Sequence, residues 1–167
     1  SYHPLTTPSV FQAEQLTFAD CRVTSFQLGY PGTPLPSAED VAGFSYTFTS
    51  EQGVDFDNAI IRIALHVAIE AKRTDEALPN EPVGEIRTET FFQVTSMDTL
   101  LTQKPDGTPA LPELVGATAL GLAFSTTRGM LLMLSAGSVL NQAFLPVINP
   151  LQLLRSSQAD QAQAAVQ

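Results

Sequence analysis

Apolar and polar residues alternate most clearly over residues 59–72. Odd positions carry aliphatic side chains, whereas even positions carry Arg62, His66, Glu70 and Lys72. Period-two alternation sustained this far predicts a long antiparallel strand with one buried and one solvated face.

Two further segments alternate in the same way. Residues 84–97 form one, although Phe91 stands among the polar positions, and residues 42–49 form a shorter one. Loop-forming residues at 74–82 connect two of these strands and indicate a hairpin. The alternating aromatic positions of the shorter segment are Phe44, Tyr46 and Phe48.

The first strand-like segment, residues 10–28, changes phase along its length. Leu16 and Phe18 share one face, Val23 takes the other phase, and Phe26 returns to the first. Such slips predict a β-bulge. The three prolines that follow, within residues 31–40, indicate a long connection rather than a tight turn.

Charged residues become rare after Glu113. Between Leu114 and Leu154 the one charged side chain is Arg128. Because Pro146 and Pro150 interrupt the stretch, we predict a long helix, an irregular linker and a short second helix. The long helix is expected at residues 113–136 and the short one from residue 149.

The pattern as a whole predicts an α+β fold, with a four-stranded antiparallel sheet followed by a long helix and a short C-terminal helix. We expect one domain at residues 10–155. Residues 1–9 are expected to form an N-terminal tail. The Gln- and Ala-rich residues 156–167 are expected to be disordered.

The long helix is apolar on all sides. A helix that covers one sheet would leave half of this surface in water, and large exposed apolar patches mark interaction sites. A membrane span is the alternative for the uncharged residues 129–145, but Asn141, Gln142 and the missing Lys/Arg flanks oppose membrane insertion. Self-association explains the pattern better. The predicted oligomer interface consists of Leu120, Phe124, Arg128, Leu131 and Leu134.

Composition narrows the function. The chain carries 17 acidic and 8 basic side chains, a net charge of −9, which repels phosphate backbones and opposes nucleic-acid binding. The polar, proline-containing first residues do not form a signal peptide, so we expect a cytoplasmic protein.

Candidate chemistry is sparse. Cys21 is the single cysteine, and His3 and His66 lack partners at ligand spacing. Glu85 and Glu89 stand on a solvated strand face. We therefore predict no catalytic residue, no metal site and no cofactor, and expect the protein not to be an enzyme.

Several motifs resemble the SecB family of protein-export chaperones over residues 10–154. Val115-Gly116-Ala117 with Phe124 and Arg128 is similar to the start of the family's long helix. The run from Leu145 to Leu154 resembles its linker and second helix. Phe11-Gln12 with Asp20, and Gly84-Glu85-Ile86, are similar to its first and fourth strands. Pro150 in place of an aromatic residue, and Leu120 in place of a proline, mark a divergent member.

The resemblance implies a homotetramer, a dimer of dimers, with client grooves for unfolded polypeptides. The implied groove residues are Phe44, Tyr46, Phe48, Val147, Ile148, Leu151 and Leu154, although the three aromatic residues could equally pack in the core. It also implies that the translocase motor SecA docks at Asp20, Val83 and Glu85. A second acidic position of this docking surface is lost near Thr24.

The implied function is that of an ATP-independent holdase, which keeps preproteins competent for export and translocation. A SecB-like chaperone dedicated to one partner, such as an antitoxin, fits the same residues. A hotdog-type thioesterase or ligand-binding domain also wraps a sheet around an apolar helix, but it places that helix before most of its strands. A structural oligomer without clients is a further alternative.

Overall fold

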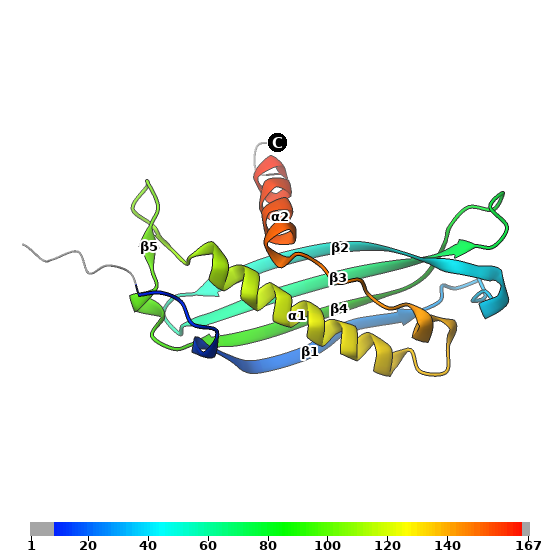
Figure 1. Ribbon diagram of the computed structural model, residues 1–167, viewed down its shortest axis with the longest axis horizontal. Coiled ribbons are helices and arrows are strands. Elements are labelled where there is room, and N and C mark those ends of the chain that lie inside the picture. Colours follow the sequence, from blue (N-terminus) through cyan, green and yellow to red (C-terminus); the bar gives the residue numbers. More distant parts are fainter. Residues whose placement is uncertain (1–8, 165–167) are drawn as a thin grey trace, which may run out of the picture.

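Four long strands form one antiparallel sheet, and two helices follow it along the chain (Figure 1). The computed structural model describes residues 9–164. The predicted α+β class and its order of elements are confirmed. The strands are β1 (Leu16–Leu28), β2 (Val41–Asp55), β3 (Ile60–Arg73) and β4 (Glu81–Val94), then the short pair β5 (Thr102–Gln103) and β6 (Pro109–Ala110). The helices are α1 (Glu113–Leu134) and α2 (Pro150–Ala164), with single-turn helices η1 (Ala13–Gln15), η2 (Ala38–Asp40), η3 (Met97–Thr99) and η4 (Val139–Gln142) between elements.

The strands lie in the order β1-β4-β3-β2, so β1 and β2 are the edges. Alternation decides which face of the sheet each side chain takes. The odd-numbered residues of β3 from Ile61 to Ala71 are buried and face α1, and we call this the inner face. The even-numbered residues of β3 lie on the opposite, outer face.

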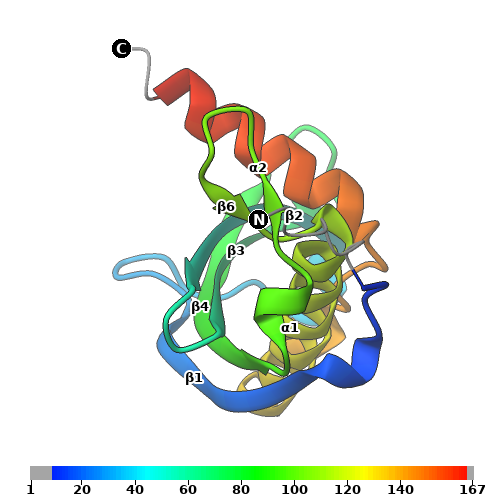
Figure 2. The same ribbon diagram turned by 90° about the vertical axis from the view of Figure 1, so that its left-hand side faces the viewer.

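Strand β1 contains two irregularities, and the bulge predicted from its phase change is confirmed. The register with β4 shifts between Phe18 and Asp20 and again between Val23 and Ser25. Bulges increase the local twist and bend of a strand. The sheet curves around α1, with β1 running beneath the helix (Figure 2).

Helix α1 packs against β3 and β4 through a stripe that includes Leu120, Phe124 and Leu131, all fully buried. The hydroxyl of Thr127 lies 2.7 Å from that of Thr88 on β4, inside this contact. Gly116 allows the helix to approach β2, because a Cβ there would lie 2.8 Å from the Gln52 Oε1.

Two elements extend further than the sequence predicted. Strand β2 continues to Asp55, and α2 runs to Ala164, so disorder from residue 156 to residue 164 was wrong. Residues 165–167 of the predicted C-terminal tail, and nearly all of the predicted N-terminal tail, lie outside the described residues.

Candidate functional site

An aromatic row occupies the inner face of β2. Phe44, Tyr46 and Phe48 are half-buried and pair across strands with buried residues of β3. The rings of Tyr46 and Phe48 stack at 6.1 Å, and Phe48 meets Phe124 of α1 edge-on at 5.2 Å. Partial burial raises the pKa of the Tyr46 hydroxyl. The row is therefore attached to the core at Phe48 and reachable from solvent along its length.

The linker between η4 and α2 crosses the same side of the sheet as α1 (Figure 1). Two of its apolar residues are highly exposed, Val147 at 90% and Phe144 at 67%, whereas Leu145 between them is buried. Ile148 and Leu151 are half-buried against the core. Leu154 differs from the prediction. It is 4% exposed and fills the core beneath α2, so it offers no surface to a client while α2 is in this position.

The outward stripe of α1 is uncharged and partly apolar. Leu114, Leu122 and Met133 are 59%, 37% and 80% exposed, and Thr118, Ser125 and Gly129 lie between them at helical spacing. This stripe requires a correction of the predicted oligomer interface. Leu120, Phe124 and Leu131 point into the chain's own sheet and cannot meet another copy.

The two remaining residues of the predicted interface are accessible. Leu134 is exposed at the end of α1. The Arg128 guanidinium lies over the Phe124 ring at 5.6 Å and donates a hydrogen bond to the Pro146 carbonyl at 2.9 Å. By length and composition alone α1 could cross a membrane. It packs along the sheet, however, and 39% of its most apolar 18-residue segment is buried.

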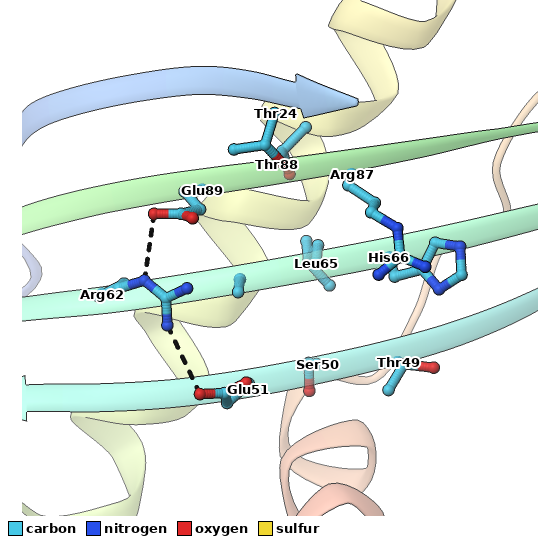
Figure 3. A pocket seen from close by; sticks show the side chains of 11 residues that line it. Thr24, Thr49, Ser50, Glu51, Arg62, Leu65, His66, Arg87, Thr88 and Glu89 are labelled. Carbon is cyan, nitrogen blue, oxygen red and sulfur yellow. Dashed lines mark hydrogen bonds and ion pairs between the residues drawn. The ribbon is translucent and has the colours of Figure 1, made fainter. Parts of the chain in front are cut away.

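The outer face of the sheet carries a hollow of about 270 Å³ (Figure 3). Its floor is the methyl group of Ala64, which stands between Glu51 and Glu89 in one cross-strand row. Arg62 and His66 flank Ala64 along β3. The hollow exists because the shortest side chain of this neighbourhood is surrounded by the longest ones.

The two carboxylates that line this hollow, Glu51 and Glu89, share one cation of the same face. Arg62 lies 3.1 Å from Glu89 and 3.6 Å from Glu51. The hydrogen bond from Arg62, and the charges of Arg62 and Arg22, lower the pKa of Glu89. His66 Nε2 lies 2.8 Å from Glu85. The Arg62 guanidinium therefore compensates part of the negative charge of Glu51 and Glu89, and Glu85 is hydrogen-bonded to His66 within the chain.

The predicted docking residues fall on two different faces. Asp20 and Glu85 are on the outer face, where Arg22 binds Asp20 at 2.6 Å and Glu85 pairs with His66. Val83 is fully buried in the core. Because a side chain without accessible surface cannot contact a partner, the inclusion of Val83 was wrong.

The one cysteine does not stand beside a base or a metal-binding group within the described residues. Cys21 is half-buried on the inner face, with its sulfur 3.3 Å from the Thr90 hydroxyl. Among residues 9–164 no three His, Cys, Asp or Glu side chains are arranged to hold a metal ion.

Sequence reasoning missed two sets of residues. The outward stripe of α1 was detectable, because Leu114, Leu122 and Met133 recur at helical spacing. Phe144 precedes the motif that drew attention to the linker and had no pattern of its own. Its exposure became visible only once the path of the chain was known.

The chain was compared with family models, curated protein sequences and solved structures, and the solved structures gave a match. No family model and no curated protein sequence matches the chain. Among solved structures it is similar to the Mycobacterium tuberculosis SecB-like chaperone Rv1957, solved in complex with a ChAD peptide from the HigA1 antitoxin Rv1956. The identity is 15%, the alignment covers 81% of this chain and 93% of that chain, and the TM-score is 0.49.

Proposed function

We propose that this protein is an ATP-independent holdase that binds extended segments of unfolded polypeptides, including preproteins awaiting export. The observation that carries the proposal is the accessible apolar surface on the α1 side of the sheet, provided by the half-buried aromatic row of β2 and the exposed linker residues Phe144 and Val147. Apolar side chains that gather on an accessible surface mark interaction sites.

The surface suits a client without a fixed sequence. Apolar burial is not directional, so binding depends on exposed apolar side chains rather than on a defined motif. Burying roughly 1,000 Å² of apolar area would contribute about 25 kcal/mol gross. Lost chain entropy and desolvation offset most of this gain. Moderate affinity and broad selectivity follow, as a holdase requires.

We propose a homotetramer, a dimer of dimers, in which the outward stripe of α1 is covered by another copy. Support comes from the absence of charge along that stripe between Glu113 and Arg128 and from its exposed apolar residues. The stripe also contains Gly129 and Ser125, whose small side chains let another helix approach closely.

Transport in the cytoplasm is the physiological setting we propose. Docking of a SecA-like partner is proposed for the outer face at Asp20 and Glu85, where it would compete with Arg22 and His66. A chaperone dedicated to one antitoxin would use the same apolar surface. Binding of several unrelated unfolded proteins is expected of a general holdase and not of a dedicated chaperone, so this measurement separates the two functions.

Aggregation of a denatured client tests the holdase proposal. Val147→Asp places a charge on a side chain that is 90% exposed, so the fold should be unaffected while suppression of aggregation falls severalfold. Leu78→Asp is the matched control, because Leu78 is also exposed but lies in the β3–β4 hairpin. Equal suppression by both variants and the wild type would argue against a client surface at the linker.

A further inference from the structure

The two edges of the sheet differ in how far they are protected against pairing with another strand. Edge strands present unpaired main-chain groups, and proteins block them with bulges, charges or prolines. Strand β1 has two bulges and carries Asp20 and Arg22. Strand β2 has one irregularity, between Val41 and Gly43, and pairs without interruption from Gly43 to Asp55; it contains no Lys, Arg or Pro.

Helix α2 divides the β2 edge into two parts. It packs against the second part, where the Ser157 hydroxyl lies 2.7 Å from that of Ser50 and Leu154 lines a cavity with Gln52 and Val54. The helix passes the edge there and projects beyond the sheet (Figure 1, Figure 2). The first part, Val41 to Thr49, is uncharged. On the side of the strand that points away from β3, no main-chain hydrogen bond joins it to another segment within residues 9–164.

We infer that the free edge of β2 from Gly43 to Thr49 binds an extended client segment as a fifth strand of the sheet. The inference rests on the proposed holdase function and adds its mode of recognition. Main-chain hydrogen bonds supply affinity that does not depend on sequence. Every second client side chain then lies on the inner face beside Phe44, Tyr46 and Phe48, and α2 stops the added strand near Ser50.

Charge favours a foreign segment over a second copy of this chain. The free edge lies between Glu39 and Asp40 of η2 at one end and Glu51 at the other. Antiparallel pairing of two copies over the whole edge, centred on Ser45, would place Glu39 and Asp40 of each copy beside Glu51 of the other. A segment with lysines at its ends meets attraction at the same places.

Hydrogen exchange of the full-length protein tests the inference. The probe is a fluorescein-labelled peptide, Lys-Val-Thr-Val-Thr-Val-Thr-Val-Lys, whose binding is followed by anisotropy. On saturation, every second amide from Gly43 to Thr49 should exchange about tenfold more slowly or better, because only alternate amides of this regular segment point away from β3. The edge amides of β1 are the internal control and should not change.

N-methylation of single peptide residues provides a second measurement. A methyl group on an amide that pairs with β2 should weaken binding about tenfold, whereas methylation of the neighbouring residue should have little effect. The loss should therefore repeat with a period of two residues along the peptide.

The outcomes separate this inference from the proposed function. Peptide binding with no change in the β2 amides, or with no period-two dependence on methylation, overturns the added strand and leaves a holdase that binds through side chains alone. Failure to suppress aggregation of any client overturns the function itself. Slow exchange of the β2 amides without peptide, increasing with protein concentration, assigns the edge to a second copy and also overturns the inference.

Discussion

Gly84 lies where the main chain of β1 and a side chain of η4 come closest to β4. A Cβ at this position would be 2.7 Å from the Gln27 carbonyl oxygen and 2.7 Å from Leu140 Cδ1. Since a main-chain carbonyl in a sheet cannot move aside without breaking the ladder, no side chain is tolerated here.

We expect Gly84→Ala to lower the free energy of unfolding by about 1–3 kcal/mol, because the added methyl group overpacks the β1–β4 contact. Gly43→Ala is the control, since a Cβ at Gly43 meets no atom within 4 Å. Denaturant unfolding should leave this control within about 0.5 kcal/mol of the wild type. Equal losses in the two variants would contradict the steric explanation.

The buried threonine pair between β4 and α1 has a defined direction. Thr127 donates its one hydroxyl hydrogen to the Ala123 carbonyl, so Thr88 is the donor in the 2.7 Å contact between the two hydroxyls. Thr127→Val removes the acceptor and strands a buried donor, at a cost of about 1–3 kcal/mol. Thr88→Val should cost less, because Thr127 keeps its own acceptor. A double-mutant cycle checks this: Thr127→Val should cost much less once Thr88 is Val.

At the scale of single residues, the sequence predicted which face of the sheet a side chain takes better than which residues that side chain contacts. Alternation assigned the side chains of β3 to the correct faces, because a strand with one buried face leaves that signature. The same reasoning could not place Val83, which lies at a register irregularity between β3 and β4 opposite Ile69 and Glu70. An irregularity shifts the phase by one residue, and only the pairing shows on which strand this happens.

Among the elements, α2 is the one whose extent the sequence concealed. Only its first turns carry leucines, so a pattern based on apolar residues ended the helix too early. Alanine and glutamine favour helix where packing does not decide. Strand β2 was shortened for a related reason, since Ser50 and Gln52 occupy its inner face beneath α2 and interrupt the apolar pattern.

An ion pair joins the start of α1 to α2. Arg155 donates two hydrogen bonds, of 2.6 and 3.1 Å, to the Glu113 carboxylate and lowers the pKa of Glu113 from its usual value near 4.5. A carboxyl group whose pKa is lower in the folded state stabilises the fold above its unfolded pKa, and this stabilisation disappears as the pH falls through the folded value.

Glu113→Gln should therefore be less stable than the wild type near neutral pH, and the difference should be smaller at a second, acidic pH below the usual carboxyl value near 4.5. Chemical denaturation at both pH values measures it. Glu14→Gln is the control, because Glu14 forms no ion pair within the described residues. A difference that stays constant with pH would show that Glu113 acts through packing and not through its charge.

At the scale of the whole molecule, the outward stripe of α1 is the contact on which the proposed tetramer depends. Leu122→Asp and Met133→Asp should each convert the proposed tetramer, four times the 17.9 kDa chain, into smaller species with an unchanged circular dichroism spectrum. Native mass measures this. Leu78→Asp, away from α1, should remain tetrameric. A wild-type mass of one chain at micromolar concentration would contradict the proposed assembly.

The sequence predicted that α1 needs a partner but not which side of α1 meets it. The helix is apolar on all sides, so its inner and outer faces cannot be told apart until the sheet is placed beneath it. Residues such as Phe124 were for that reason assigned to the wrong neighbour.

The two bulges of β1 have a consequence for how this strand tolerates changes of chain length. Ala19 and Thr24 have no cross-strand partner, so deletion of either would leave the remaining side chains on their present faces. Deletion of a residue elsewhere in β1 would turn part of the strand inside out. Loss of both bulges would, however, straighten β1 and open the second edge of the sheet to foreign strands. A protein shortened in this way should still fold, yet form fibres on storage.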